Sequence, residues 1–543
     1  MGPSSADVAR RFDAVVVGAG HNGLVGAAVL ARAGLSVLVV EAKASIGGAC
    51  RTERPFARCP GVGCSTGAYL LGPTPPEVLE AAGLRGRIKI LPRRPHGYFL
   101  NERGMPVALG VAGGDAHLSP HDRAAMLALD GAVCAMRDDT GPLWLDTAID
   151  VRSSVLRVRE DVVPGAGGAT VRDLYRGLML GEEGRGGSVA GLVDRFRFES
   201  PMLRAVIATD GLVGSAGGMH DAGTGANFLA HNMLRLAPGD GPWEAAPLGA
   251  WQLVEGGMGA VTGALRAVVE EHGGEVRTGC GARRVVSREG AAAGVELGDG
   301  TFVAAPRVLV AVDPRAAAAL MAADGAGPAR LHPAESGAAR DMRGTSLKVN
   351  MALRSLPRVA GVERLPESLR HVQPLNGTVH VLPEGDVEER LESARRAAVE
   401  EERTPDPDDC MIDVYTHSAV DRSLCDGEGR HAMSLFVQWV PWDMDQGRAD
   451  EFAQRLIRGP VARVMPELPG LVEDMMVLGP RQIEERFGIR GGHIHHVDNG
   501  YAMERRRPTG PGVKGVALAG AGWHPAGSVI GCSGLLAARA LLG

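Results

Sequence analysis

The stretch DAVVVGAGHNGLVGAAVLARAGLSVLVVEA, residues 13–42, decides the fold of this chain of 543 residues. Its apolar run at residues 15–17 is suited to a buried parallel strand and leads into GAGHNG, residues 18–23, a complete G-x-G-x-x-G motif. A helical pattern follows and stops at Gly34, and a second strand, residues 36–40, delivers Glu41. Strand, glycines, helix, strand and acid in this order predict a Rossmann-like unit that binds an adenine dinucleotide.

Each glycine of this motif has a physical role. Gly18 permits the tight turn, Gly20 lets the backbone approach a pyrophosphate, and Gly23 lets the helix pack against the strand. The pyrophosphate is expected at the helix N-terminus, where free N–H groups and the helix dipole favour an anion. An acid at the ribose position disfavours NADP because it would repel a 2′-phosphate, whereas NAD and FAD stay undistinguished by this unit. The predicted contacts here are Gly18, Gly20, His21, Asn22, Gly23, Glu41 and Ala42.

A second glycine pair follows the ribose acid in EAKASIGGACRT, residues 41–52. Gly47 and Gly48, with Ala49 behind them, would let a loop lie against the pyrophosphate a second time. This doublet resembles that of the flavoprotein superfamily that contains amine oxidases and phytoene desaturases. The flanking Ile46 and Cys50-Arg51 resemble the desaturase side more than the amine oxidases. The resemblance implies FAD as the cofactor.

Further segments, far apart in the chain, resemble the same family. AWQLVEGGMGAVTGAL, residues 250–265, is similar to the family's G-G-M-G element, in which glycines introduce a helix that returns the chain to the nucleotide domain. In the next strand, the resemblance places the backbone near Val285 against the adenine ring. Residues 294–314 read as a hairpin that turns at Asp299-Gly300, then a buried strand that ends at Asp313-Pro314, where the proline is expected to bar a further helix.

The C-terminal segment GVALAGAGWHPAGSVIGCSGLLAARALL, residues 515–542, carries the other strong resemblance. A strand at residues 516–519 leads to Gly520-Ala521-Gly522, and Ser528 is a candidate N-cap for the last helix. In the family this segment passes the flavin, and the helix start faces the pyrimidine edge of the ring. Negative charge on the reduced ring would be stabilised by the helix N-terminus. Gly522, Ser528 and Val529 are therefore further predicted FAD contacts.

The whole chain is similar to phytoene desaturase and carotenoid isomerase-like FAD proteins, in a branch resembling the mitochondrial pyridine nucleotide-disulphide oxidoreductase domain-containing proteins. The implied fold class is α/β: a Rossmann-like FAD-binding domain of the glutathione-reductase type with an inserted α+β substrate domain. The FAD-binding domain is expected in three parts, residues 10–110, 246–318 and 486–543. The substrate domain is expected in two parts, residues 111–245 and 319–485.

Candidate catalytic residues come from the last family-like segments. His524 lies in the loop expected to line the flavin and could serve as acid and base, or could only hold backbone in a tight turn before Pro525. His496 stands at the family's histidine position, in GGHIHH where relatives carry G-G-N-I-F-H, and Trp523 could form an apolar wall. His493 and His495 would share one face of a strand, but nothing nearby completes a shell, so no metal is expected.

The resemblance implies dehydrogenation (desaturation) or redox-neutral isomerisation of a hydrophobic, polyene-like substrate, with hydride transfer to flavin N5. Two alternatives stay open: a flavin amine oxidase acting on a C–N bond, and a non-catalytic carrier or escort protein for an apolar ligand. Aromatic residues make up 4% of the chain, which makes an aromatic cage for an amine harder to build. No second dinucleotide motif follows an apolar strand, so electrons are expected to leave to oxygen, a quinone or another carrier.

Composition restricts the partners. The net charge of −6 and the absence of a basic stripe argue against nucleic acid. The N-terminus lacks a signal sequence and no run of 18 apolar residues occurs, so a cytoplasmic bacterial protein, with peripheral membrane contact as an option, is expected. The eight cysteines are expected as free thiols, and the pair Cys59 and Cys64 lies in a Gly- and Pro-rich stretch that is a poor redox helix. The sequence leaves the oligomeric state open.

Overall fold

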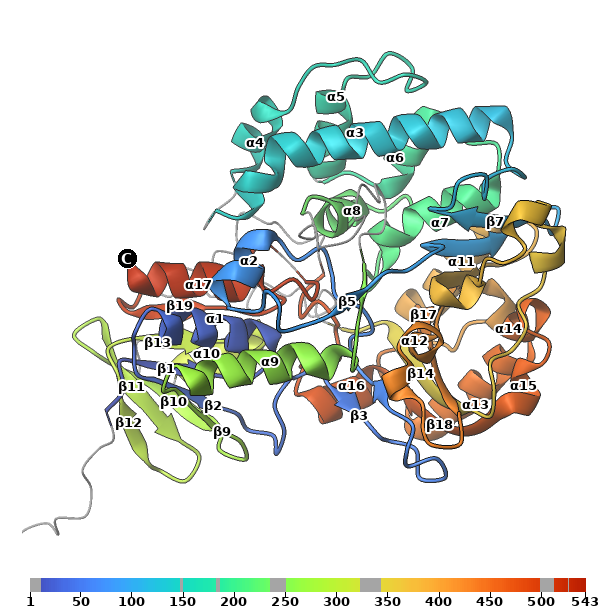
Figure 1. Cartoon of the computed structure of the whole chain (residues 1–543). Coiled ribbons are helices and arrows are strands. Elements are labelled where there is room, and N and C mark those ends of the chain that lie inside the picture. The colour runs from blue at the N-terminus through green and yellow to red at the C-terminus, as the bar shows by residue number, and fades with distance from the viewer. Residues whose placement is uncertain are drawn as a thin grey trace, which may run out of the picture.

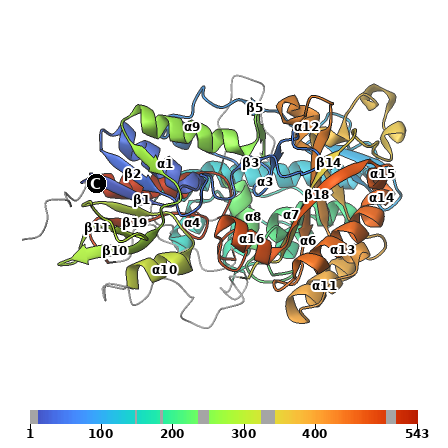
Figure 2. The same ribbon diagram turned by 90° about the horizontal axis from the view of Figure 1, so that it is seen from below.

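Two large sheets and a cap of helices build the molecule (Figure 1). The computed structural model describes residues 11–146, 150–181, 186–234, 251–322, 343–498, 512–525 and 527–543. Figure 2 shows the elements of one sheet, β1 and β2, at one end of the molecule and those of the other, β14 and β18, at the opposite end.

The first sheet is parallel and forms the nucleotide-binding part. Its strands are ordered β19 (Val516–Leu518), β13 (Val308–Val310), β1 (Ala14–Val17), β2 (Val37–Val40) and β9 (Glu275–Arg277). The N-terminal, central and C-terminal segments therefore meet in one sheet, as the sequence predicts. In register, Val16 pairs with Val39 on one side and with Leu309 on the other, and Leu309 pairs with Ala517.

Three helices cover one face of this sheet: α1 (His21–Arg32), α9 (Met258–Glu271) and α17 (Cys532–Leu542). The short α2 (Pro76–Ala81) packs beside them. α1 and α17 approach closely because each presents a glycine at the contact. A Cβ added to Gly26 would lie 3.2 Å from the carbonyl oxygen of Gly534. A Cβ added to Gly534 would lie 2.1 Å from the carbonyl oxygen of Asn22.

Gly534→Ala is expected to destabilise the protein because the two helices would have to separate. Overpacking of this kind lowers the free energy of unfolding by about 1–3 kcal/mol. The higher helix propensity of alanine offsets only about 1 kcal/mol of this loss. Gly263→Ala, on the exposed side of α9 with no atom within 4 Å of the added Cβ, is the matched control and should stabilise. Thermal unfolding of both variants checks this: equal shifts in Tm would contradict the close α1–α17 contact.

A small antiparallel sheet follows α9 and β9. It consists of β10 (Ala282–Arg288), β11 (Ala291–Leu297) and β12 (Phe302–Ala304), with the predicted hairpin turn at Asp299-Gly300. The expectation that Pro314 bars a helix is wrong, since α10 (Pro314–Ala322) begins at this residue. Proline is tolerated at the first helical position, where its missing N–H would have no intrahelical partner. Asp313 caps the helix by accepting from Arg315 N and Ala316 N.

The second sheet has seven strands and forms the substrate side. Their order is β18 (Val472–Leu478), β14 (Ser346–Leu353), β17 (His431–Gln438), β16 (Ile412–Tyr415), β15 (Thr378–Val381), β6 (Gly97–Leu100) and β7 (Pro106–Leu109). β6 and β7 join this sheet although residues 10–110 were expected to belong to the FAD-binding domain. The chain thus enters the substrate sheet before residue 110.

The helices α13 (Gln446–Arg458), α14 (Pro460–Val464) and α15 (Leu468–Leu471) pack on the outer face of this sheet. α16 (Pro480–Phe487) lies on the inner side, where Ile483 and Phe487 pack with Leu478. α11 (Val387–Arg395) shares the apolar cluster of the helical cap, and α12 (His417–Val420) contacts β17. On β14, Leu347, Val349 and Met351 pack with Phe452 and Leu456 of α13 in one apolar cluster. The alternate residues of the strand therefore face inward, toward the nucleotide-binding part.

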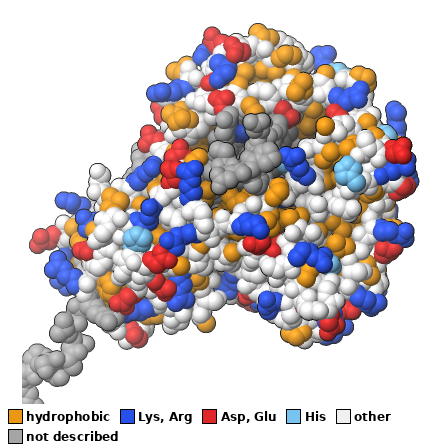
Figure 3. Space-filling view, in the orientation of Figure 1, with side chains coloured by type: hydrophobic (Ala, Val, Ile, Leu, Met, Phe, Trp, Pro, Cys, Tyr) orange, Lys and Arg blue, Asp and Glu red, His pale blue; other side chains and the backbone are white. Residues whose placement is uncertain are grey.

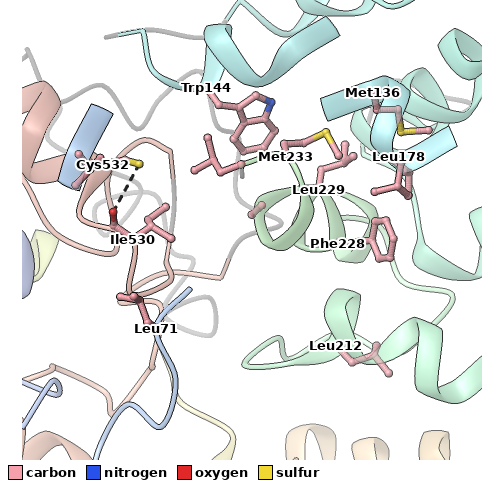
Figure 4. Packing of buried hydrophobic residues seen from close by; sticks show 14 of the residues in the cluster. Leu71, Met136, Trp144, Leu178, Leu212, Phe228, Leu229, Met233, Ile530 and Cys532 are labelled. Carbon is pink, nitrogen blue, oxygen red and sulfur yellow. Dashed lines mark hydrogen bonds between the residues drawn. The ribbon is translucent and has the colours of Figure 1, made fainter. Parts of the chain in front are cut away.

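The helical cap lies over both sheets in Figure 1. It contains α3 (Pro120–Trp144), α4 (Val151–Arg157), α5 (Val171–Leu180), α6 (Val189–Phe196), α7 (Pro201–Leu212) and α8 (Thr224–Asn232). Figure 4 shows Trp144, Met136, Leu178, Phe228 and Met233 packed in its interior. Residues 165–170 form a turn that leads into the N-cap of α5, where Thr170 and Asp173 make a capping box.

Two short ladders join these parts: β3 (Thr52–Glu53) with β4 (Cys64–Ser65), and β5 (Ile90–Leu91) with β8 (Leu253–Val254). All eight cysteines are free thiols, which confirms that expectation. No helix in the described ranges combines the length and the hydropathy that crossing a bilayer requires. On the face in Figure 3, acidic and basic side chains are interspersed.

Candidate functional site

One cavity of about 1510 Å³ runs from the nucleotide-binding part to the inner face of the seven-stranded sheet. Its outer end is lined by Glu41 and Gly281, its middle by the glycines of the first motif, and its inner end by Lys348 and Tyr415. The two halves of the fold therefore share one continuous space.

The glycine motif shapes the middle of the cavity. Gly18 adopts φ +98°, and a Cβ there would lie 2.6 Å from the carbonyl oxygen of Ala311. A Cβ on Gly23 would lie 2.0 Å from the carbonyl oxygen of Gly18. Gly20 differs, because its Cβ would meet no atom within 4 Å and the residue lines the cavity. The space beside Gly20 is open at the place where the sequence predicts a pyrophosphate, so the residues fit that group.

Glu41 is held rigidly at the outer end of the cavity. Its Oε2 accepts from Ala19 N at 2.8 Å and its Oε1 accepts from Lys43 N at 2.8 Å. Ala42 lines the cavity next to it. A carboxylate oxygen has more than one lone pair, so Glu41 keeps acceptor capacity for ribose hydroxyls. This position suits the predicted role of Glu41.

His21 and Asn22 also line the cavity, between the glycines. Burial lowers the pKa of His21 to about 4, so its imidazole is neutral at neutral pH. Asn22 Oδ1 accepts from Gly534 N at 3.2 Å and so links α1 to α17. The second glycine pair approaches as expected: Gly47 N donates to Ala19 O at 2.8 Å, and Gly47, Gly48 and Ala49 line the cavity.

Two predicted cofactor contacts, Val285 and Gly522, lie outside the cavity. Val285 is buried in the apolar core of the small sheet, and Gly281, Ala282 and Arg283 line the cavity in its place. Gly522 packs against Pro314, while Gly520 and Ala521 line the cavity.

Ser528 and Val529 do line the cavity, but Ser528 is not the N-cap of the last helix. α17 begins later, at Cys532, after Gly531 with φ +72°. Ser528 Oγ is buried and has no hydrogen-bond partner among the described residues, so its hydroxyl can bind a ligand instead. This orphaned hydroxyl is a second sign that the residues fit a polar cofactor.

Of the three catalytic candidates, the structure brings only His496 to the cavity. His496 has φ +62°, and burial lowers its pKa to about 4, so it is a neutral group there. His524 stacks with Trp144 at 6.3 Å between ring centroids, and Trp523 packs in the apolar core with Val310; neither lines the cavity. Both side chains thus pack into the fold behind the loop that carries them.

The histidine-rich segment forms a turn, not the strand that would align His493 and His495. Their rings lie 6.0 Å apart, and His495 lines the cavity. No group of three or more metal-ligating side chains occurs in the part of the chain that the structure describes.

His524→Ala is expected to lower Tm while leaving kcat within about threefold, because the ring is a buried packing group outside the cavity. His496→Ala is expected to change kcat or KM at a nearly unchanged Tm. Steady-state kinetics and thermal unfolding of the two variants check the assignment. A large loss of kcat in His524→Ala with its Tm preserved would return that residue to the catalytic site.

The inner end of the cavity is built by the inward face of the seven-stranded sheet. Lys348 pairs across the ladder with Phe436, Phe436 with Asp413, and Asp413 with His380, which forms one row over four strands. In the next row Tyr415 pairs with Thr378. All six side chains belong to cavity-lining residues: Lys348, Phe436, Asp413, His380, Tyr415 and Thr378.

Lys348 is the residue that sequence reasoning missed. Its Nζ lies 4.3 Å from the ring centroid of Tyr69 and 4.9 Å from that of Phe436. Burial lowers its pKa to about 7, so the amine titrates near neutral pH. The sequence SLKVNMAL, residues 346–353, contained the pattern that could have identified it. Leu347 and Val349 alternate with polar residues, so a strand here places Lys348 on the face opposite to the leucine and the valine.

The aromatic side chains of this chain gather here despite their scarcity. Tyr69 and Tyr415 lie 5.4 Å apart, and Phe436 and Trp251 line the same compartment. Four aromatic side chains therefore line one compartment, although aromatic residues make up 4% of the chain.

Acidic side chains share the compartment with these rings. Asp413 Oδ1 lies 2.7 Å from His380 Nδ1, and Asp210 Oδ2 accepts from Asn232 Nδ2 at 3.0 Å. On α3, burial raises the pKa of Asp130 to about 7. The compartment thus combines apolar walls with several buried ionisable groups.

The model of flavin containing amine oxidoreductases matches residues 23–355, which is more than half of the chain. A protein of Mycobacterium tuberculosis is 30% identical, with 99% of this chain and 98% of that protein covered. Pyridine nucleotide-disulfide oxidoreductase domain-containing protein 2 of Rattus norvegicus is 27% identical over 97% of this chain and 93% of its own. Hydroxyneurosporene desaturase of Rubrivivax gelatinosus is 29% identical over 36% of this chain and 38% of its own.

Among solved structures, cyclohexylamine oxidase from Brevibacterium oxydans superimposes with a TM-score of 0.55 at 15% identity, covering 98% of each chain. At that identity the likeness concerns the fold, which is the predicted Rossmann-like architecture with an inserted substrate domain. Together with the glycine cradle and the family match, it leads to one conclusion: the chain belongs to the flavin containing amine oxidoreductase family and is an FAD-dependent oxidoreductase.

Proposed function

We propose that this FAD-dependent oxidoreductase dehydrogenates a substrate with an apolar body at the inner end of the cavity. The single observation that carries this is the continuity of the cavity, which joins the open space at Gly20 to the compartment around Lys348. FAD, when bound, supplies the capacity to accept a hydride from a C–H bond. The protein's own task is then to orient that bond, exclude water and take up a proton.

The walls of the compartment suit the first two tasks. Leu70, Val206, Ile207 and Phe436 line it, so an apolar segment of a substrate would displace water there. Lys348, the cavity-lining amine whose pKa lies near 7, would accept the proton that leaves the substrate. A group that titrates close to the working pH is an effective general base.

Oxidation of an amine is the second candidate function, and the tyrosine pair favours it. Tyr69 and Tyr415, tilted by 48° with centroids 5.4 Å apart, present aromatic surface of the kind that attracts cations. The partial match to a desaturase supports dehydrogenation of a C–C bond, and the family match supports C–N chemistry. Redox-neutral isomerisation and the carriage of an apolar ligand are the remaining outcomes to be tested.

Anaerobic incubation with candidate substrates separates these outcomes. We expect bleaching of the flavin's visible absorption and a product lighter by two hydrogens. Release of ammonia and a carbonyl product would identify amine oxidation, and a product of unchanged mass with the flavin still oxidised would identify isomerisation. If ligands bind but no polyenes, apolar acids or amines in the panel are converted, the carrier function replaces the enzymatic proposal. Reoxidation by oxygen and by a soluble quinone would then identify the electron acceptor.

A further inference from the structure

Arg93 is a buried cation on the wall of the cavity that the dehydrogenation chemistry does not use. It follows β5, lines the compartment and is 4% exposed. Its Nη1 donates to Trp251 O at 3.1 Å and its Nη2 to His96 O at 3.2 Å; Nη2 also donates to Thr378 Oγ1. Every one of these acceptors is neutral.

No carboxylate of the described residues lies within salt-bridge distance, 4.0 Å, of the Arg93 guanidinium. The nearby acids have other partners: Asp413 pairs with His380, and Asp210 accepts from Asn232. Burial lowers the pKa of Arg93, while the charges of Tyr415 and Asp413 act in the opposite direction without contacting it, and arginine stays protonated in proteins. A buried charge of this kind is costly unless an anion pairs with it.

The hydrogen bonds of Arg93 also leave donors for a ligand. A guanidinium carries five N–H groups, and three bonds to the protein leave two of them. These are the Nε–H and one Nη1–H, which lie on different edges of the guanidinium because both N–H groups of Nη2 are engaged. A carboxylate can therefore accept one direct charge-assisted hydrogen bond from Arg93, in addition to the attraction between the two charges. A hydrocarbon in the same position would leave the charge unpaired.

The place of Arg93 relative to Lys348 sets the length of the ligand. The guanidinium lies 6.0 Å from the ring centroid of Tyr415, Tyr415 lies 5.4 Å from Tyr69, and Tyr69 lies 4.3 Å from Lys348 Nζ. In the sheet, Lys348 on β14 and Thr378 on β15 are three strand spacings apart, about 14 Å. Two tyrosines therefore separate the cation from the amine.

We propose that Arg93 binds a carboxylate at one end of the substrate, so that the substrate class is an elongated apolar carboxylic acid whose oxidised carbon lies toward Lys348. The apolar body spans Tyr415 and Tyr69, and the acid group neutralises the buried guanidinium. This inference rests on the proposed function for the position of the oxidised carbon, but the carboxylate subsite itself does not require turnover.

The test is equilibrium binding of decanoate and of its neutral isostere decanamide to the oxidised holoenzyme, followed by calorimetry and by the flavin spectrum. A charge-assisted hydrogen bond stabilises by about 1.5–3 kcal/mol, so decanoate should bind about tenfold to hundredfold more tightly. Arg93→Gln should abolish this preference, and Arg93→Lys should keep only part of it, because the three N–H groups of an ammonium cannot replace all three bonds to the protein and also reach a carboxylate. Arg85→Gln removes the same charge from a side chain that is 74% exposed, and should leave the preference intact.

Flavin content and Tm of each variant show whether it folds. If Arg93→Gln does not fold, Thr378→Val serves instead, since it removes a hydroxyl that holds Nη2 while keeping the charge, and it should weaken decanoate more than decanamide. Equal affinities of the wild-type protein for both probes, no binding of either, or a preference that survives in Arg93→Gln would overturn the proposal. Because nothing is oxidised in this assay, its failure leaves the anaerobic turnover test, and thus the proposed function, to stand or fall separately.

Discussion

Gly20→Val is expected to give a folded protein that retains no FAD. The side chain would enter open space, because no protein atom lies within 4 Å of the Cβ position, so the fold itself meets no clash. The same space is the cavity region in which the pyrophosphate must approach the backbone. Overpacking against a ligand costs about 1–3 kcal/mol, which lowers the affinity for FAD by about tenfold to hundredfold. A branched side chain adds to this cost, so the variant should lose its FAD.

Two comparisons make this result specific. Gly263→Val, also without an atom within 4 Å of its Cβ but on the exposed side of α9, should keep its flavin. Gly18→Val should fail differently, by not folding, because φ is +98° and the Cβ would lie 2.6 Å from a backbone oxygen. The measurements are FAD content after gel filtration and Tm with and without added FAD. Unchanged FAD content in Gly20→Val would remove the pyrophosphate assignment.

Lys348→Met is expected to slow flavin reduction by about 10²- to 10⁴-fold, the range that general acid–base groups contribute. Methionine fills similar volume without the amine, so FAD should stay bound and the product complex should keep its apolar contacts. In the wild-type protein the rate of flavin reduction should rise with pH through about 7, because the amine loses its proton there. The variant should not show this rise. Single-turnover reduction followed across pH is the measurement.

The stability of Lys348→Met has a definite sign. The folded pKa is about 7 and the ordinary value is 10.5, so between these pH values the unfolded chain binds the extra proton and the folded protein does not. The free energy of unfolding of the wild-type protein therefore rises with pH across this window. Below the window the lysine is charged in both states, so the folded protein bears the whole cost of burying that charge. The variant lacks the penalty and should be more stable at pH 6, with the difference fading toward pH 10.

Lys89→Met is the control, because that ammonium is 65% exposed and pairs with Glu255. It should alter neither the rate nor its pH dependence. A wild-type reduction rate in Lys348→Met, or a pH limb near 7 that survives the substitution, would exclude this amine as the proton acceptor.

The nucleotide-binding half could be predicted from sequence because its information is local. Gly18, Gly20, Gly23 and Glu41 lie within one strand–helix–strand unit, and their spacing alone fixes the turn, the cradle and the acid. The distant segments that complete the sheet could be recognised because each contains an apolar strand next to glycines. The errors there were local too: Pro314 starts a helix, and Gly531 rather than Ser528 precedes α17.

The substrate half was less predictable because tertiary contacts define it. Arg93, Asp210, Lys348 and Tyr415 come from separate parts of the chain, and only the paired strands and α7 bring them to one compartment. His524 looked catalytic because of its neighbours in sequence, but its ring turns toward Trp144. The alternation in residues 346–353 did mark the inner face of β14, and it is the feature from which Lys348 could have been found.

The visible absorption spectrum of the purified protein tests the central claim most directly. The account predicts an oxidised flavin spectrum, one FAD released per chain on denaturation, and recovery of the spectrum when FAD is added to the stripped protein. A colourless protein that regains no flavin absorption with added FAD would contradict it.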